Sequence, residues 1–190
     1  MKNLYIIAGC NGAGKTTASF TVLPEILDCH EFVNADEIAR GLSPFQPEKA
    51  AFESGRIMLN RIKALLESNV DFAFETTLST RSYVNFAKKA QKQGYSVTLL
   101  FFLLDSVELA IERVSTRVTE GGHNIPEDVI RRRYERGLSN FFTLYKPIAD
   151  NWSLINNSGD SYEIIAEKSD KVEIIINNEV WTKLKSNYDE

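Results

Sequence analysis

The stretch that decides the fold reads Gly9-Cys-Asn-Gly-Ala-Gly-Lys-Thr16. It matches the pattern GxxxxGK[ST], and it lies between a short apolar run, Leu4 to Ala8, and a segment of helical character that begins near Lys15. In this context the glycines let the backbone fold around an anion, and the helix N-terminus adds a favourable dipole. The sequence therefore predicts a phosphate-binding loop whose ligand is a nucleoside triphosphate, and a chance glycine-rich turn with a solvated lysine is the alternative.

Each residue of the loop has an expected role. Lys15 reaches the β and γ phosphates, and the hydroxyl group of Thr16 ligates Mg²⁺, so ATP and Mg²⁺ are the expected cofactors. For Cys10, a small side chain that fills the loop is favoured over a thiolate stabilised by the helix dipole. The residues expected to contact the nucleotide are Gly9, Cys10, Asn11, Gly12, Ala13, Gly14, Lys15, Thr16 and Thr17.

Outward from the loop, short apolar strands alternate with helices. Further strands are predicted at 32–36, 70–75, 97–104 and 152–156, and helices at 15–24, 47–67, 81–93, 105–120 and 126–149. The last helix contains Gly137, where it can bend. Because parallel strands need crossover helices, the pattern predicts an α/β fold with a parallel sheet flanked by helices.

The C-terminal region differs from the rest in charge. The net charge is −4, and residues 1–158 hold 18 basic and 18 acidic residues whereas residues 159–190 hold 4 and 8. Apolar runs at 162–166 and 172–176 predict an antiparallel β-hairpin at the sheet edge. We therefore expect a core at 1–158 and a C-terminal hairpin and terminal segment at 159–190 that is not an independent domain.

Length and composition exclude several classes of protein. The chain has 190 residues, of which 43% are hydrophobic and 25% charged, which is typical of one globular domain. Its longest apolar stretch, 97–104, is much shorter than the roughly 20 residues of a membrane helix, and its acidity argues against a general nucleic-acid binder. Cys10 and Cys29 form no CxxC pair and no signal peptide precedes the first strand, so we expect a cytoplasmic protein.

The carboxylate residues that follow the loop in the sequence indicate which class of phosphate-binding protein this is. Asp105 ends an apolar strand as a Walker B aspartate would, but Ser106 follows it where a hydrolytic ATPase has glutamate, and a helix N-cap explains it. Asp36 and Glu75 are favoured instead, because each ends a predicted strand at the edge where ligands bind. For Asp36 the alternative is a cap of a helix at 37–40, whereas Glu75 is costly to bury without a partner.

An arginine-rich segment at 113–136 predicts a lid. It holds six of the ten arginines of the chain and no lysine, and Gly121-Gly-His-Asn124 is a plausible hinge between its two helices. Guanidinium groups suit the charge that spreads during phosphoryl transfer. We favour Arg117, Arg131 and Arg133 over Arg132, with a solvated charged face as the alternative. His123 is either a phosphate contact or a turn residue.

Four segments in this order, IIAGCNGAGKTT, FVNADEIARGLSPF, FAFETTLSTR and RVTEGGHNIPEDVIRRRYERGL, resemble the zeta-toxin-like P-loop kinases, specifically their short bacterial branch. The resemblance covers about 4–159. It implies a P-loop NTPase fold of the kinase type and ATP-dependent phosphorylation of a small-molecule hydroxyl group, that of UDP-N-acetylglucosamine in the better-known zeta toxins. By position it implies that Asp36 takes the proton of the acceptor hydroxyl. The segment that binds the acceptor would comprise Glu75, Thr76, Thr77 and Arg81.

Together these observations predict an ATP phosphotransferase that acts on a small molecule, either a nucleotide sugar or another metabolite. Its catalytic residues would be Lys15, Asp36, Arg117, Arg131 and Arg133. The alternative is a regulatory ATP-binding or ATPase module, or a toxin–antitoxin component that acts through protein contacts with an antitoxin partner.

Overall fold

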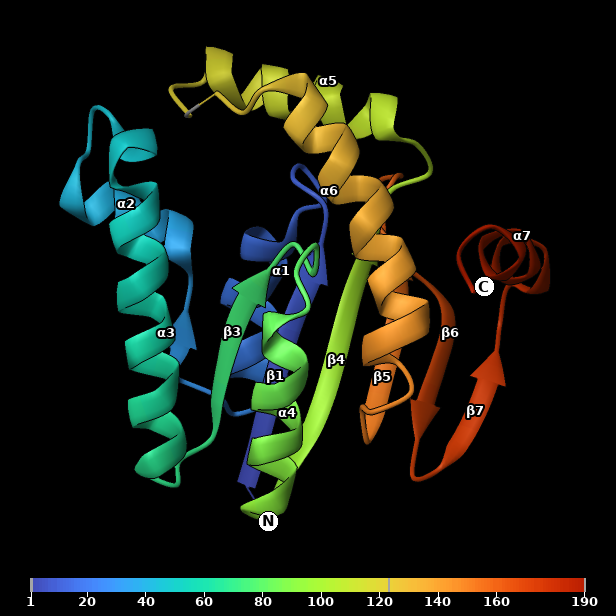
Figure 1. Cartoon of the computed structure of the whole chain (residues 1–190). Coiled ribbons are helices and arrows are strands. Elements are labelled where there is room, and N and C mark those ends of the chain that lie inside the picture. Colours follow the sequence, from blue (N-terminus) through green and yellow to red (C-terminus); the bar gives the residue numbers. More distant parts are fainter. Residues whose placement is uncertain (1, 123, 190) are drawn as a thin grey trace.

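The chain is built around one seven-stranded sheet (Figure 1), and a computed structural model describes residues 2–122 and 124–189. The expectation for His123 therefore lies outside the described residues. The strand order is β2-β3-β1-β4-β5-β6-β7; the first five strands in this order run parallel, and β6 runs antiparallel to both of its neighbours, β5 and β7. This confirms the parallel α/β sheet and the hairpin at its edge. The strands are β1 Lys2–Gly9, β2 Phe32–Val33, β3 Phe72–Thr76, β4 Tyr95–Leu103, β5 Asn151–Asn156, β6 Glu163–Ser169 and β7 Val172–Ile175.

Helices cover both faces of the sheet, with α4 and α6 on one face and α1 on the other (Figure 1). The helix α5 crosses above the ends of the central strands, and α2 and α3 flank the β2 edge. None of the helices in the described residues combines the length and the apolar character that crossing a membrane would need. The helices are α1 Lys15–Thr21, α2 Ala35–Leu42, α3 Ala51–Glu67, α4 Ser82–Lys92, α5 Val107–Thr119, α6 Glu127–Asn140 and α7 Asn178–Tyr188.

The largest differences between the predicted and the observed elements are at β2, α6 and α7. The strand expected at 32–36 ends at Val33, and α2 begins two residues later. The C-terminal helix α7 was not predicted. The helix expected at 126–149 is α-helical only over α6, which ends at Asn140, and a π-helical turn follows at 141–145. Gly137 within α6 serves close packing, because a Cβ at this position would lie 2.8 Å from the carbonyl oxygen of Thr77. This close approach brings α6 against the loop that follows β3.

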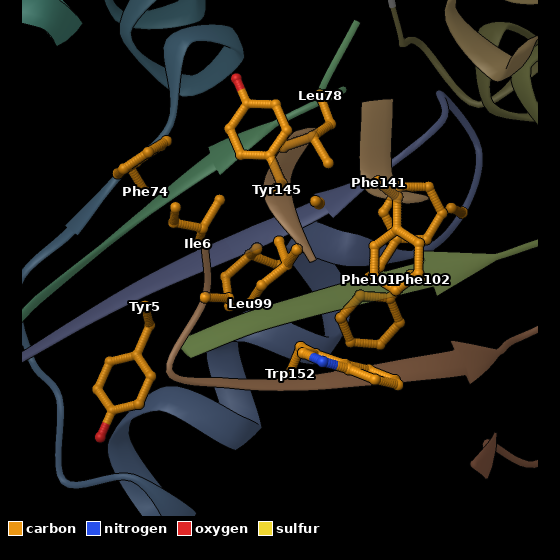
Figure 2. Packing of buried hydrophobic residues seen from close by; sticks show 14 of the residues in the cluster. Tyr5, Ile6, Phe74, Leu78, Leu99, Phe101, Phe102, Phe141, Tyr145 and Trp152 are labelled. Atoms are coloured by element: carbon orange, nitrogen blue, oxygen red, sulfur yellow. The ribbon is translucent and has the colours of Figure 1, made fainter. Parts of the chain in front are cut away.

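The core extends over both faces of the sheet, and one part of it lies between β4 and the helices on the α6 face (Figure 2). β4 is apolar along most of its length because it is covered on both sides, as central parallel strands usually are. The ring of Phe141 packs against Phe101 at a centroid distance of 4.9 Å and against Trp152 at 5.9 Å. Each such buried aromatic side chain stabilises the fold by roughly 1.5–3 kcal/mol. The packing therefore fixes α6 on the sheet.

The C-terminal helix packs through aromatic stacking. The ring of Trp181 in α7 lies parallel to that of Trp152 in β5, with centroids 5.7 Å apart. The Nζ atom of Lys146 lies 4.8 Å from the centroid of Trp181 and 5.2 Å from that of Trp152, within the range of cation–π attraction. These contacts hold the C-terminal segment on the α6 side of the sheet.

Candidate active site

The phosphate-binding loop connects β1 to α1 in a backbone conformation that requires glycine. Gly9, Gly12 and Gly14 have φ angles of 141°, 79° and 75°, and a Cβ at Gly9 would collide with the carbonyl oxygen of Phe102. The Nδ2 atom of Asn157 donates a hydrogen bond to the carbonyl oxygen of Ala13 at 2.9 Å. The loop is thus braced from the end of β5.

Six of the nine loop residues line a cavity of about 510 Å³ that lies against the loop. Gly9, Cys10 and Ala13 are buried beneath the loop surface. Burial raises the pKa of the Cys10 thiol to about 11, so the thiol is protonated at neutral pH. The loop residues that line the cavity are Asn11, Gly12, Gly14, Lys15, Thr16 and Thr17.

The ammonium group of Lys15 is buried at the centre of the site. Its Nζ atom donates to the carbonyl oxygen of Cys10 at 2.8 Å and lies 3.5 Å from Oε1 of Glu75. The side chains of Lys15 and Glu75 are only 6% and 10% exposed. A buried carboxylate needs such a partner, and Lys15 supplies it. Glu75, which the sequence placed in the acceptor-binding segment, therefore contacts the phosphate-binding loop itself.

A polar cluster at the end of β3 joins the loop to α2. The Oγ1 atom of Thr16 donates to Oε2 of Glu75 at 2.7 Å, and Nδ2 of Asn34 donates to the same oxygen at 2.9 Å. The Oδ1 atom of Asn34 caps α2 by accepting from the backbone N–H groups of Asp36 and Glu37. No role for Asn34 was predicted from the sequence, although an asparagine three residues before a glutamate is a signal for the start of a helix.

Asp36 lies in the first turn of α2 and not at the end of a strand. The cap of α2 is Asn34, so the alternative in which Asp36 caps a short helix is wrong. The Asp36 side chain is exposed to the cavity and lies near Arg133. Burial lowers the pKa of Arg133, and the negative charge of Asp36 opposes that shift. The Nη1 atom of Arg133 donates to Oδ1 of Asn11 at 3.0 Å, which brings it to the loop.

The other arginines of the 113–136 segment have different positions. Arg117 lines the loop cavity, and its Nε and Nη2 atoms are buried with no hydrogen-bond partner among the described residues. Arg113 also lines this cavity, but its guanidinium group donates to the carbonyl oxygens at 157 and 158. Arg131 pairs with Glu108 at 2.9 Å and with Glu127 at 2.8 Å and does not line this cavity.

Asp105 is likewise kept away from the loop. Its Oδ1 atom accepts a hydrogen bond from Asn156 at 2.8 Å, and it does not line the loop cavity. The expectation that Asp105 caps the following helix is wrong, because the cap is Ser106, whose side chain accepts from the N–H group of Leu109. Asp105 has a local structural role at the end of β4.

A second cavity, of about 560 Å³, lies between α3 and the loop that follows β3. Thr76 and Thr77 line it, whereas Arg81 is exposed at the start of α4 and does not. The loop is held by two hydrogen bonds of 2.7 Å, from Asn140 to the carbonyl oxygen at 78 and from Tyr145 to that at 80. Burial raises the pKa of Tyr145 to about 12, so its hydroxyl group stays a donor.

The two cavities meet. Both are lined by Asn11, Lys15, Asp36 and Glu75. One cavity continues past the phosphate-binding loop to Arg117, and the other continues along α3. An arrangement of this kind can hold two different ligands whose reacting ends meet between Lys15 and Asp36.

The strand that leads into the phosphate-binding loop lies between β3 and β4, and β3 ends in a carboxylate that touches the loop. A loop so placed, with helices on both faces of a parallel sheet, is the arrangement of P-loop proteins, and the chain has a P-loop NTPase fold of the kinase type.

Comparison with known proteins then gives the family. A model of the zeta toxin family matches residues 43–170, and an uncharacterized protein of Haemophilus influenzae is 33% identical over 137 residues, which are 70% of this chain and 94% of that protein. The chain belongs to the zeta toxin family.

Solved structures share the fold. A chain of the AvrRxo1-ORF1:AvrRxo1-ORF2 complex, solved with sulphate ions, superposes with a TM-score of 0.75 at 18% identity. The match covers 97% of this chain but only 63% of the length of the other. A chain of the PezAT chromosomal toxin–antitoxin system of Streptococcus pneumoniae superposes with a TM-score of 0.67 at 14% identity, covering 99% of this chain and 78% of that one.

Proposed function

We propose that the protein transfers the γ-phosphoryl group of ATP to a hydroxyl group of a small molecule. The observation that carries this proposal is the pair of cavities that meet at Lys15 and Asp36. A protein that only binds or hydrolyses ATP needs one ligand cavity beside its loop, whereas a phosphotransferase needs a second one for the acceptor.

ATP would lie in the cavity that continues to Arg117. The loop N–H groups and Lys15 would bind its phosphates, and the unpartnered guanidinium atoms of Arg117 would bind phosphate oxygens. A chain of the AvrRxo1-ORF1:-ORF2 complex solved with ATP superposes with a TM-score of 0.74 at 19% identity, which supports ATP as the donor.

Mg²⁺ fits beside Thr16 and Glu75. The described residues contain no cluster of three or more His, Cys, Asp or Glu side chains that could hold a metal ion. Mg²⁺ commonly binds through one or two protein oxygens together with substrate phosphates, and Thr16 and Glu75 supply such oxygens 2.7 Å apart. The ion would neutralise charge on the phosphates. We therefore assign Glu75 to the metal side of the site.

Asp36 would act on the acceptor. Its exposed carboxylate can orient the hydroxyl group and accept its proton, while the acceptor oxygen bonds to the γ-phosphorus and the bond to the β-phosphate oxygen breaks, releasing ADP. Arg133, held by Asn11 near Asp36, would stabilise the charge on the phosphoryl group in transit. Arg131 is not placed to do so, because two carboxylates hold it elsewhere.

The acceptor cavity has two unlike walls. On α3, Phe52 is 87% exposed and Arg56 is exposed beside it, with Gly55 between them. Phe52 could stack against a ring, and Arg56 could bind an anionic group. A sugar carried on a nucleotide offers a ring and anionic phosphates, as well as hydroxyl groups for the facing wall, so a nucleotide sugar is our proposed acceptor class. The facing wall is rich in hydroxyl groups, from Thr76, Thr77, Ser79, Thr80, Ser82 and Tyr83.

The test is incubation of the purified protein with ATP, Mg²⁺ and a pool of bacterial metabolites, followed by mass spectrometry. We expect one species, or a related set, to gain one phosphate in step with the loss of ATP. A Lys15→Ala variant serves as the control and should leave the pool unchanged. Finding no phosphorylated species in an extract that contains nucleotide sugars would count against the proposal.

A second candidate function is that of a toxin–antitoxin component that acts through protein contacts. It is supported by the PezAT system, a toxin–antitoxin system to which the fold is similar. Stable co-purification with the product of a neighbouring gene, together with ATP turnover that stays at background in the metabolite pool, would favour it. Both candidates agree with a cytoplasmic location, which we propose because the two cysteines are buried and unpaired.

A further inference from the structure

The outermost strand of the sheet, β7, has no strand beyond it in the described chain (Figure 1). Four exposed apolar side chains lie on it and just after it: Val172, Ile174, Ile175 and Ile176 are 60%, 51%, 43% and 56% exposed. An edge strand presents unpaired backbone groups, and proteins commonly protect such edges with lysine or proline. β7 contains neither, and its only charged residue is Glu173.

We propose that β7 is the interface of a homodimer in which two copies of the chain pair their β7 strands antiparallel. The two seven-stranded sheets would then form one continuous sheet across a two-fold axis. The proposal concerns a surface remote from the phosphate-binding loop, so it stands independently of the proposed function.

Backbone hydrogen bonding selects which residues can pair. Ile176 donates its N–H group to the carbonyl oxygen of Ile165 in β6. Because the direction of the backbone groups alternates along a strand, those of Ile174 and Val172 also point to β6, and those of Glu173 and Ile175 point to the free edge. A two-fold axis at Ile174 places each Glu173 opposite Ile175 of the other copy, and this allows four backbone hydrogen bonds.

The same register pairs apolar side chains with one another. It places Ile174 opposite its own copy, as a non-hydrogen-bonded pair in which side chains approach closely, and Val172 opposite Ile176 on both sides. Glu173 contacts Lys146 at 3.5 Å, so the opposite face of the strand is the one that carries the three apolar residues. The dimer would bring these six apolar side chains from the two copies into one row of neighbours on the same face of the continuous sheet, and each would lose part of its contact with water.

Other registers are less favourable. An axis at Glu173 would place two carboxylates directly opposite each other, and like charges in that position are destabilising. An axis at Ile175 would require Asn177 to pair with Glu173, but the N–H group of Asn177 already bonds to Ile165. The strand is therefore complementary to itself in one register, which favours a second copy of this chain over an unrelated strand.

The first test measures the molar mass of the full chain by size exclusion with light scattering, from about 1 to 100 µM, a range that reports micromolar dissociation constants. We expect a concentration-dependent dimer. Ile174→Lys should raise its dissociation constant about tenfold or more, because it removes the central apolar pair and sets two like charges opposite each other. Ile26→Lys, at another exposed isoleucine (70%), should have no effect.

A second test checks the register and does not depend on the strength of the dimer. Directly opposite residues of a non-hydrogen-bonded pair have Cα atoms about 4.5 Å apart, within disulfide range, so Ile174→Cys should form a covalent dimer on mild oxidation. Glu173→Cys should not, because its two copies would be offset by two residues. The native Cys10 and Cys29 are buried and do not interfere. A monomer at all concentrations, or a dimer that is insensitive to Ile174→Lys, would overturn the proposal.

Discussion

Asn34 connects the phosphate-binding loop to α2, and its replacement by alanine should be unusually costly. The side chain is 6% exposed. Its Oδ1 atom caps α2 by accepting from Asp36 and Glu37, and its Nδ2 atom donates to Glu75 at 2.9 Å and, less closely, to Thr16 at 3.3 Å. Asn34→Ala removes both sets of contacts at once.

The expected loss has two parts. Removing a helix cap costs about 0.5–2 kcal/mol, and removing a hydrogen bond to a charged group costs about 1.5–3 kcal/mol. The free energy of unfolding should therefore fall by about 2–5 kcal/mol, measured by urea titration of the tryptophan fluorescence without nucleotide. Ser106→Ala is the matched control, because it removes only the cap of α5 and should cost about 0.5–2 kcal/mol.

Two results would refute this reasoning. One is an equal loss for Asn34→Ala and Ser106→Ala, because it would mean that the contact with Glu75 contributes nothing. The other comes from Asn34→Asp, which keeps an oxygen for the cap but sets a second carboxylate beside Glu75. This variant should lose stability as well, and full stability would show that the Nδ2 donor is dispensable.

Three further predictions follow from the site. Arg117→Leu should reduce the rate of phosphoryl transfer by about 10³ or more. It should leave the free energy of unfolding unchanged or raise it, since it removes a guanidinium group with unpartnered buried atoms. The control variant Arg132→Leu should leave the rate of transfer unchanged. Gly55→Leu should raise the KM for the acceptor without changing the affinity for ATP, because the space beside this helical glycine belongs to the acceptor cavity. The control variant Gly41→Leu, in equally open space on α2, should leave the KM for the acceptor unchanged. Arg131→Ala should leave both the free energy of unfolding and the rate of transfer nearly unchanged, because its ion pairs are exposed to solvent; urea titration and the transfer assay measure the two quantities.

The sequence predicted the parts of the fold that local spacing determines. The GxxxxGK[ST] pattern gives the loop because its glycines and lysine act within eight consecutive residues, and the alternation of apolar strands with helices gives the parallel sheet. The hairpin was predictable because both of its strands are apolar runs around a polar turn. The helix α7 was not predictable, because only two of its residues, Trp181 and Leu184, are buried. The contact that buries Trp181, with Trp152, joins segments far apart in the chain.

The candidate site was predictable in composition but only partly in geometry. Arg131 and Arg133 both flank the buried side of the same helix, and only the way α6 crosses the sheet sets Arg133 against Asn11 and Arg131 against two carboxylates. Glu75 was expected to need a partner, but the sequence could not tell that Lys15 and Asn34 supply it, since these contacts join segments far apart in the chain.

The most direct test of phosphoryl transfer compares Asp36→Asn with the wild-type protein, using the species that the metabolite pool reveals as the acceptor. In one experiment, binding of ATP and formation of the phosphorylated product are both measured. We predict that Asp36→Asn binds ATP as tightly as the wild-type protein and forms almost no product, because the amide cannot accept the proton of the acceptor. Product formation at the wild-type rate would contradict the role of Asp36 and the meeting of two ligands at this residue.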